Sequence, residues 1–530
     1  MGSNPIAPTM VSLYIGDARD VLASLPEKSV HAVITSPPYY GLRAYKSPPS
    51  VWGGKGDCKH KWGATIPHPM RKSGQHGPGS CVAVGTKAAQ HGLRKTGDQG
   101  CFCGRCGAWR GVLGMEPTLE LYVEHLGVIG EGIRRVLRDD GIFWLNLGDS
   151  YMGSGGPGGD FRDGKGGDIY CRPYNRSGDG LKTKDMCAVP WRVALAFQMQ
   201  GWWLRSDCIW KKENVMPESM DGWRWEMHRV KVKNLRRAST EWATKSGNTS
   251  GDAGPGLSYN PWAEYKPCPG CAECRPNDGL VLRMGAWRPT KAHEYVFMFT
   301  KGERYFGDGD AVREQAVTSE WPGIGPKHIQ ARSRLEEYVP MEARETRNRR
   351  TVWTINTTGF KGSHFATFPT ALVEVMVNVS TSFRGVCPKC GAQWARIVNR
   401  KSLERHELAR DDPRYRPARY KGKYAELKGE TGNAMRYVDI EHLGWRPTCK
   451  CKEDGEPLPA VPAVVLDPFV GSGTACFEAQ RLGRDAIGID VSDEYIQMSL
   501  KRVRDDAPLF NQVEVIYANG RVKRCAGASR

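Results

Sequence analysis

The sequence has no long hydrophobic run and no pattern typical of a leader. No stretch of about 18 consecutive apolar residues occurs, so a membrane-spanning helix is not expected. The first residues, MGSNPIAPTM, lack a basic region followed by an apolar run, so a secretory signal is not expected either. No repeat of fixed period is present. These absences predict a cytoplasmic protein, and they leave its oligomeric state open.

Acidic residues are scarce relative to basic ones. The 530 residues include 76 Lys and Arg against 58 Asp and Glu, a formal net charge of +18. This excess suits a polyanionic partner, because each neutralised phosphate releases counterions and adds sequence-independent affinity. A basic protein without such a partner has the same composition, so charge alone leaves both possibilities open. The length suits one large domain or two to three ordinary ones.

Segments with α/β patterning alternate with segments rich in Gly, Pro and charge. Helical periodicity is clearest between Leu119 and Leu137, and Asp139 to Gly141 is then expected to turn the chain into a strand at 142–147. Strands alternating with helices predict an α/β, Rossmann-like fold with a mostly parallel sheet and helices on both faces. Strand candidates lie at 11–15, 32–34, 142–147, 201–210, 293–300, 464–467 and 486–490.

We expect one catalytic domain interrupted by several insertions. Its core segments are 11–45, 113–212, 351–383 and 461–506. The insertions are 46–112, 213–350 (with a core strand near 293–300) and 384–460, and a tail follows at 507–530.

Residues 466–474, LDPFVGSGT, follow an apolar strand candidate and precede a helix candidate. Glycines at such a turn let the backbone approach a bound ligand closely. Asp490 ends the next strand candidate, 23 residues after Asp467, where a carboxylate can accept hydrogen bonds from ribose hydroxyls. A lone Gly-x-Gly is often an ordinary loop. Strand, loop, helix, strand and acid in this order predict a nucleotide-like cofactor.

Residues 34–39, ITSPPY, place a double proline at a strand end. Two successive prolines have no backbone N–H, so the turn presents carbonyl oxygens and the Ser36 hydroxyl as fixed acceptors. Such acceptors can orient the two N–H donors of an exocyclic amine, whose lone pair can then attack a sulfonium methyl in line. Tyr39 offers a face on which a base lifted out of the duplex can stack. A solvent turn or a proline-rich ligand motif is the alternative for Pro-Pro-Tyr alone.

Together the two motifs resemble those of the amino-methyltransferase family of DNA-modifying enzymes. That family has a catalytic motif Ser/Asn/Asp-Pro-Pro-Tyr and a cofactor motif that ends Phe-x-Gly-x-Gly. The catalytic motif comes first here, which resembles the permuted "beta" order. Residues 137–149, 201–211, 293–301 and 360–369 resemble further parts of the family, so the resemblance covers roughly half of the chain.

The resemblance implies a methyltransferase that uses S-adenosylmethionine and acts on double-stranded DNA, as in restriction–modification systems. It also implies a bacterial, phage or archaeal cytoplasm. Ser36 resembles the cytosine-N4 branch, whereas Asp is more usual in adenine-N6 enzymes, which remain the alternative. The implied catalytic residues are Ser36, Pro37, Pro38 and Tyr39. The implied cofactor residues are Asp17, Phe360, His364, Phe368, Asp467, Pro468, Phe469, Gly471, Gly473, Thr474 and Asp490.

Other functions are disfavoured by what the motifs contain. No Pro-Cys-Gln segment occurs, which argues against ring-carbon cytosine methyltransferases, since these need a thiolate. Families that methylate RNA or protein glutamine favour Asn at the position of Ser36. A zinc-bearing DNA-binding protein without activity is a further rival, disfavoured by the presence of both motifs.

Many of the 17 cysteines cluster as Cys-x-x-Cys, which indicates metal binding in a reducing cytosol. Two groups supply the number of ligands that a tetrahedral zinc site needs. Cys268, Cys271 and Cys274 supply only three, and the sequence does not identify a fourth. The expected zinc ligands are Cys58, His60, Cys103 and Cys106 in one group, and Cys387, Cys390, Cys449 and Cys451 in the other.

The region 213–285, and the stretch up to about residue 350, is expected to recognise the DNA sequence. Aromatic and basic residues interleave there, as on a phosphate-contacting surface. A solvated basic face explains the same run without DNA. The residues are Trp223, Trp225, Arg229, Lys231, Lys233, Arg236 and Arg237.

Overall fold

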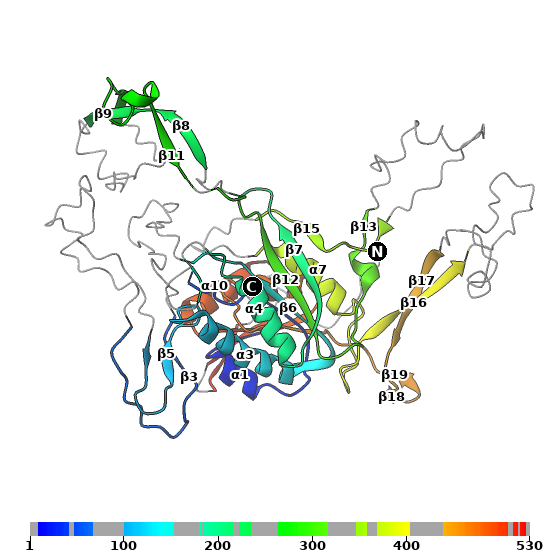
Figure 1. The fold of residues 1–530 in the computed structure, drawn as a ribbon. Coiled ribbons are helices and arrows are strands. Elements are labelled where there is room, and N and C mark those ends of the chain that lie inside the picture. Colours follow the sequence, from blue (N-terminus) through cyan, green and yellow to red (C-terminus); the bar gives the residue numbers. More distant parts are fainter. Residues whose placement is uncertain are drawn as a thin grey trace, which may run out of the picture.

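A ten-stranded sheet forms the centre of the molecule (Figure 1). The computed structural model describes residues 9–41, 47–66, 100–152, 180–182, 185–215, 222–234, 263–285, 287–315, 346–357, 368–402, 438–506, 512–517 and 520–525. The strand order is β15 (Val352–Thr354), β7 (Trp203–Lys211), β12 (His293–Thr300), β6 (Leu137–Leu147), β2 (Val30–Thr35), β20 (Val464–Asp467), β21 (Asp485–Asp490), β1 (Met10–Ile15), β22 (Gln512–Tyr517) and β23 (Val522–Cys525).

Most of this sheet is parallel. The strands from β6 to β22 run in one direction, and β15 runs parallel to β7. Only β12 and β23 lie antiparallel to their neighbours. The predicted α/β, Rossmann-like fold is therefore confirmed.

Helices cover both faces of the sheet, and successive residues of one strand point to different cores. Val33 of β2 belongs to the core under α1, α3 and α4, whereas Ile34 belongs to the core under α7, α9 and α10. All six residues of β2 are buried, as expected of a strand covered on both faces. The helices are α1 (Ala18–Ser24), α3 (Leu119–Val136), α4 (Val189–Met199), α7 (Thr370–Ser380), α9 (Thr474–Arg481) and α10 (Asp493–Asp506).

Helix α3 illustrates how the sequence determines these elements. The Thr118 hydroxyl caps its N-terminus by accepting the Leu121 N–H at 3.2 Å. Arg134 and Arg135 lie in the last turn, where the helix dipole favours positive charge. The Arg135 guanidinium also donates to the carbonyl oxygens of Leu22 and Ala23, at 2.6 and 2.9 Å, and so satisfies the C-terminal end of α1.

The turn expected at residues 139–141 is an irregularity inside a strand. Strand β6 begins at Leu137, five residues before the start expected from the sequence. Leu137 pairs with Val30 and Ile142 pairs with Ala32, so the residues between them bulge out of the ladder. A Cβ at Gly141 would lie 2.9 Å from the His31 carbonyl oxygen, which explains the glycine at this close approach.

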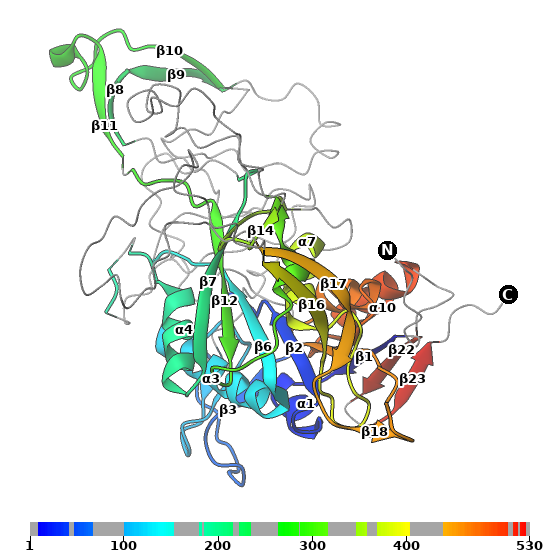
Figure 2. The same cartoon turned by 90° about the vertical axis from the view of Figure 1, so that its right-hand side faces the viewer.

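Smaller sheets accompany the main one in the described part of the chain. Figure 2 shows that the ribbon containing β8 to β11 stands well away from the central sheet. No helix among the described residues is long and apolar enough to cross a membrane. The small sheets are β3 (Ser50–Trp52), β5 (Trp109–Gly111) and β4 (Cys101–Phe102); β8 (Trp223–Met227) with β11 (Leu280–Met284); β9 (Arg229–Asn234) with β10 (Ala263–Pro267); β13 (Glu314–Gln315) with β14 (Thr346–Arg347); β16 (Trp394–Ser402) with β17 (Val438–Pro447); and β18 (Lys452–Glu453) with β19 (Glu456–Pro457).

Candidate functional site

The two sequence motifs meet at one edge of the sheet. The carboxyl ends of β1, β2, β20 and β21 lie at this edge, where ligands bind in open α/β sheets. A cavity of about 420 Å³ opens there. Among the residues that line it are Asp17, Ser36, Pro37, Pro38, Tyr39, Phe368, Pro468, Phe469, Gly471, Thr474 and Asp490.

Some expected cofactor residues lie elsewhere. Asp467 and Gly473 are next to the cavity but are not part of its lining. Asp467 lies beneath it, where its carboxylate accepts the Thr35 hydroxyl at 2.6 Å and the Phe469 N–H at 3.0 Å. It therefore ties strand β2 to the glycine-rich turn. Phe360 and His364 lie outside the described residues.

A hydrogen-bond network holds the Ser36-Pro37-Pro38-Tyr39 tetrapeptide. The Ser36 hydroxyl donates to the Tyr39 hydroxyl at 3.2 Å, and Tyr39 donates to the Glu294 carboxylate at 2.6 Å. The Asn146 amide donates to Ser36 Oγ, Tyr39 Oη and Glu294 Oε2 at 3.3, 2.9 and 3.0 Å. Because a carboxylate only accepts, its contact with Asn146 fixes which end of that amide is the nitrogen.

Glu294 carries the charge of this network. Burial raises the pKa of Glu294, but the Lys212 ammonium and the hydrogen bonds from Tyr39 and Asn146 outweigh burial and hold the pKa below its ordinary value. Lys212 forms an ion pair with Glu294 and lies 4.2 Å from the centre of the Trp210 ring. The ionised carboxylate therefore anchors Tyr39 at neutral pH.

Two further contacts shape the tetrapeptide. The Tyr122 hydroxyl, from α3, donates to the Pro38 carbonyl oxygen at 2.9 Å. A Cβ at Gly148 would lie 2.7 Å from the Tyr39 ring, so only glycine leaves room for the tyrosine there. The Pro38 carbonyl oxygen therefore already accepts a hydrogen bond from Tyr122.

The glycine-rich turn approaches the neighbouring elements closely. Gly471 and Gly473 have φ values of 48° and 80°, a left-handed conformation that favours glycine. A Cβ at Gly473 would lie 2.9 Å from the Cβ of Ser499 on α10. The Ser499 hydroxyl donates to the Gly471 carbonyl oxygen at 2.7 Å, which fixes the turn against that helix.

Buried carboxylates flank this turn. Asp490 accepts the Gly471 N–H at 3.1 Å and the Ser492 N–H at 2.9 Å. Burial raises the pKa of Asp490 to about 6, against these hydrogen bonds. Burial likewise raises the pKa of Asp467 to about 7. Both groups thus change charge near neutral pH, which is typical of ligand sites.

Asp17 differs from Asp467 and Asp490, because its surroundings lower the pKa of its carboxyl and favour the ionised form. It caps α1 by accepting the Arg19 N–H at 3.0 Å, and its carboxylate forms an ion pair of 2.7 Å with the Arg19 guanidinium. Burial raises the pKa of Asp17, but the hydrogen bonds from Arg19 and Ser50 outweigh it and lower the pKa overall. Arg19 is itself stacked 3.8 Å from the centre of the Trp52 ring.

The cysteines gather into three groups of four ligands in the described part of the chain. The ligand atoms of Cys58, His60, Cys103 and Cys106 lie within 4.8 Å of one another, and so do those of Cys387, Cys390, Cys449 and Cys451. The third group contains Cys268, Cys271 and Cys274, and its fourth member is His228. The first two groups are those expected from the sequence.

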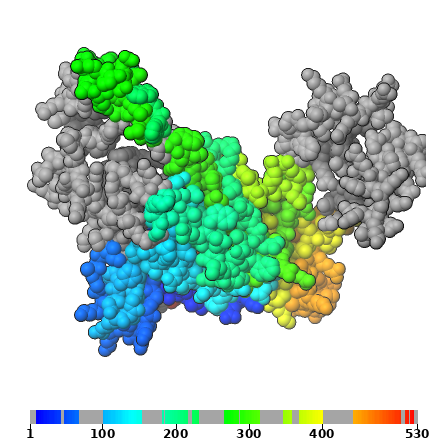
Figure 3. Space-filling view, in the orientation of Figure 1, coloured from blue at the N-terminus to red at the C-terminus, as the bar shows by residue number. Residues whose placement is uncertain are grey.

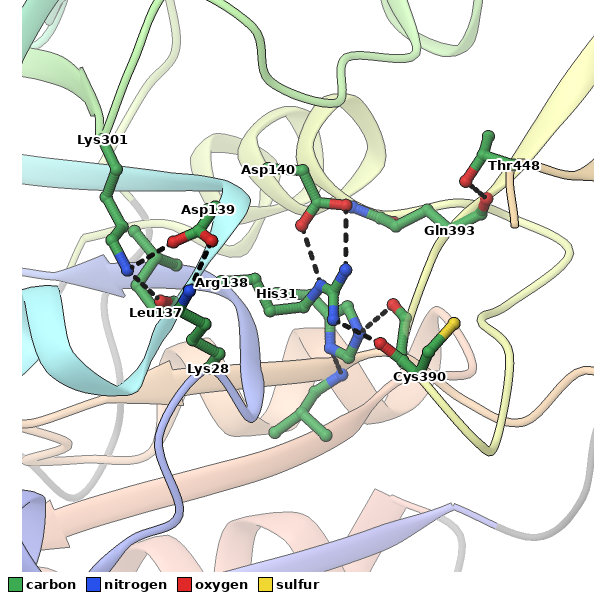
Figure 4. Close-up of polar contacts among 12 residues, drawn as sticks. Lys28, His31, Leu137, Arg138, Asp139, Asp140, Lys301, Cys390, Gln393 and Thr448 are labelled. Atoms are coloured by element: carbon green, nitrogen blue, oxygen red, sulfur yellow. Dashed lines mark hydrogen bonds and ion pairs between the residues drawn. The ribbon is translucent and has the colours of Figure 1, made fainter. Parts of the chain in front are cut away.

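The loop of the 387–390 group docks on the bulge of β6, as Figure 4 shows. Arg138 donates to the Cys390 carbonyl oxygen at 2.7 Å and forms an ion pair with Asp140 at 2.8 Å. His31 accepts the Val464 N–H at Nδ1, so its Nε2 carries the proton and donates to the Gly391 carbonyl oxygen at 3.0 Å. Burial and the nearby Arg138 lower the pKa of His31 to about 4, which keeps this ring neutral.

Sequence reasoning did not find Asn146, Lys212, Glu294 or His228. Asn146 could have been recognised from the sequence, since it is the one amide side chain in the apolar run of residues 142–147. Lys212 and Glu294 lie close together because β7 and β12 pair in a register that places His293 opposite Lys211. This register cannot be predicted from the sequence. His228 is 40 residues before Cys268, too far for a spacing pattern.

The fold and the site define a class of protein, a nucleotide-cofactor transferase of the α/β methyltransferase type. A family model described as DNA methylase, covering the N6 and N4 methyltransferases, matches residues 30–387 and 462–501. The chain belongs to this family and is an S-adenosylmethionine-dependent DNA methyltransferase.

Similar proteins include type II methyltransferases. The chain is 24% identical to M.Cfr9I of Citrobacter freundii over 504 residues, which are 95% of this chain and 91% of that protein. It is 25% identical to M.SmaI of Serratia marcescens over 93% of this chain and 90% of that protein. Among solved structures, PvuII DNA methyltransferase (cytosine-N4-specific) is similar at 14% identity and a TM-score of 0.37, covering 94% of this chain and 90% of that one.

Proposed function

We propose that this enzyme methylates the N4 amine of cytosine in duplex DNA, and adenine-N6 is the alternative. The observation that carries the proposal is Ser36. A neutral hydroxyl, hydrogen-bonded to Tyr39 and Asn146, lines the cavity where adenine-N6 enzymes more usually have Asp. The same acceptors suit either amine, so the preference for cytosine rests on the resemblance of Ser36 to the cytosine-N4 branch.

The amine is held by acceptors that remain available in the cavity. Tyr122 occupies the Pro38 carbonyl, which leaves the Pro37 carbonyl and the Ser36 hydroxyl for the two N–H donors. Asn146 Oδ1 is a third acceptor, since it is buried and has no hydrogen-bond partner among the described residues. Hydrogen bonds that draw the amine toward pyramidal geometry direct its lone pair outward, and no covalent enzyme intermediate is needed.

Tyr39 positions the base. Its ring borders the cavity while its hydroxyl is fixed by Glu294, so the ring offers a rigid face for a base lifted out of the duplex.

The glycine-rich turn and Asp490 bind the methyl donor. S-adenosylmethionine supplies the methyl group on a sulfonium centre. The Asp490 oxygens each take one backbone N–H and keep further lone pairs for ribose hydroxyls, and Asp17, Phe368, Pro468, Phe469 and Thr474 complete the lining.

The groups at Cys58 and Cys387 bind zinc in this proposal. Three thiolates and an imidazole in one group, and four thiolates in the other, lie within 4.8 Å of one another and suit closed tetrahedral Zn²⁺ sites, which contribute to folding. Such sites stabilise insertions that have little core of their own.

Nucleoside analysis tests the choice of base. Duplex DNA incubated with the enzyme and S-adenosylmethionine is digested and analysed by mass spectrometry, and N4-methylcytosine is expected. N6-methyladenine would refute the choice of base and keep the class of enzyme. The Ser36→Ala variant, which lacks the hydroxyl acceptor, is expected to leave most of the DNA unmodified while still binding the cofactor.

Asn146 tests the account of the amine's acceptors. The Asn146→Ala variant is expected to lose about 10²-fold in kcat, because it removes an acceptor and the support of Tyr39, with the cofactor Kd unchanged. Asn399→Ala is the matched control, since Asn399 is exposed on β16 and does not line the cavity. Equal kcat values for the two variants would contradict the assignment.

A further inference from the structure

A two-stranded ribbon, β8 with β11, lies in the chain between β7 and β12. Lys212 N–H donates to the Ala292 carbonyl at 2.8 Å, and Gly285 N–H donates to the Gly222 carbonyl at 3.0 Å. Beyond these bonds β8 pairs with β11, and Trp223 lies opposite Met284. The ribbon thus starts beside Lys212 and Glu294 and projects away from the sheet; its green tip lies apart from the body of the molecule in Figure 3.

This ribbon has almost no hydrophobic core. Alternate residues of β8 and β11 form one face, and they are exposed large apolar side chains. A two-stranded ribbon that buries so little is marginally stable on its own. The exposed fractions are 71% for Trp223, 52% for Trp225, 57% for Met227, 38% for Leu282 and 68% for Met284. Of the described residues of β8 and β11, Val281 is buried, so apolar burial between these two strands contributes little to holding the tip.

At the tip, three cysteines and a histidine converge. Cys271 Sγ lies 3.7 Å from Cys274 Sγ and 3.3 Å from His228 Nδ1. Ligands at Zn–S distances of about 2.3 Å and Zn–N distances of about 2.0 Å in a tetrahedron are separated by about 3.5 to 3.8 Å. The observed spacings are close to those of a zinc site.

The backbone supports the same arrangement. The Cys268 N–H donates to the His228 carbonyl at 2.8 Å, and the His228 N–H donates to the Gly279 carbonyl at 2.8 Å. Gly279 N–H donates in turn to the Cys274 carbonyl at 3.0 Å. His228 is therefore fixed between the two chain segments that carry the cysteines, as a ligand that bridges them.

We propose that His228 completes a zinc site with Cys268, Cys271 and Cys274, and that the bound Zn²⁺ holds the tip of the ribbon folded. Three thiolates and one imidazole are soft and borderline ligands that favour zinc over the hard cations Mg²⁺ and Ca²⁺. The four side chains supply all four ligands of a tetrahedral site, as in structural zinc sites, whereas catalytic zinc sites keep one position open. The site is independent of which base is methylated.

Metal analysis of the full-length protein tests this site. With the other two groups occupied, the wild type is expected to contain three zinc ions per chain after dialysis against a mild chelator, and His228→Ala and Cys271→Ser two each. His442→Ala is the matched control, since His442 is exposed on β17 outside the three groups, and it should keep the wild-type content. Cofactor binding by each variant shows that the core is folded.

The zinc contents of these variants distinguish a zinc site at His228 from its absence. Equal zinc content in wild type, His228→Ala and Cys271→Ser would overturn the proposal, and so would iron in place of zinc. If the variants fail to fold, limited proteolysis of wild type decides: chelator treatment should expose the chain between residues 222 and 285 to cleavage, and a ribbon equally resistant with and without chelator refutes the role of the metal. None of these readouts depends on methylation.

Discussion

At the scale of single residues, the proposed role of Asp490 predicts that cofactor binding depends on pH. Its folded pKa of about 6 lies above the ordinary value, so the carboxyl stays protonated until the pH approaches neutrality. The ribose hydroxyls need the ionised form as acceptor. The affinity for S-adenosylmethionine is therefore expected to rise with pH through this pKa.

We predict that the cofactor Kd increases about tenfold for each pH unit below 6 and levels off above about pH 7, measured by calorimetry. Asp490→Asn should bind weakly at every pH with a flat profile in this window. Asp485→Asn, at the opposite end of β21, is the matched control and should keep the wild-type profile. A wild-type Kd that does not change between about pH 5 and 8 would refute this role.

The sequence identified part of the site and missed the rest for a physical reason. Ser36, Gly471 and Asp490 were readable because each stands in a local pattern of strand, turn and helix. Lys212 and Glu294 were not, because their partnership depends on the register of β7 and β12. Local motifs can be recognised in the sequence, whereas the register between strands depends on how the sheet packs.

At the scale of elements, the loop at residues 387–391 depends on a glycine. Gly391 has a φ of 69°, and a Cβ there would lie 2.6 Å from Arg138 Nη1. Arg138 could move away only by breaking its hydrogen bonds to Cys390 and Asp140. The glycine thus preserves the docking of the loop on β6.

Gly391→Ala is expected to lower the free energy of unfolding by roughly 2 to 3 kcal/mol in chemical denaturation. Gly455→Ala is the matched control, because Gly455 has a φ of 85° but nothing lies within 4 Å of an added Cβ. Gly455→Ala should lower the free energy of unfolding by only about 1 kcal/mol, the cost of a left-handed backbone conformation for alanine. Equal losses in the two variants would show that the contact with Arg138 does not matter.

The elements themselves were largely predictable. The strand expected at 293–300 is β12 with the same bounds, and the helix expected from Leu119 is α3. Strand β6 began earlier than expected, because a polar Asp139-Asp140-Gly141 sequence reads as a turn although the sheet accommodates it as a bulge. Helix α4 starts at Val189, with Pro190 in its first turn, where proline is tolerated.

At the scale of the whole molecule, the ribbon presents a separate surface away from the central sheet (Figure 2). Exposed tryptophans on it suit contact with a nucleic acid, and the ribbon lies in the chain between β7 and β12. We therefore expect it to contribute to DNA binding and not to cofactor binding.

Replacing residues 223–284 by a short Gly-Ser linker is geometrically feasible, because Gly222 and Gly285 are hydrogen-bonded to each other. The shortened enzyme should bind S-adenosylmethionine as wild type does, which serves as the internal control. Its affinity for duplex DNA, measured by fluorescence anisotropy, should fall at least about tenfold, the equivalent of one lost base contact. An unchanged DNA affinity would exclude the ribbon from the DNA surface.

The position of β1 between β21 and β22 has a consequence for how the chain is made. Met10 N–H bonds to Asp485, 475 residues later in the chain. Because these partners are 475 residues apart, a ribosome releases β1 long before β21 and β22, and β1 lacks these two partners while the residues between are made. The cavity, which residues 16–18 and 468–495 help to line, therefore forms only after the later segment is made, and a bound ligand can stabilise the chain only from then on.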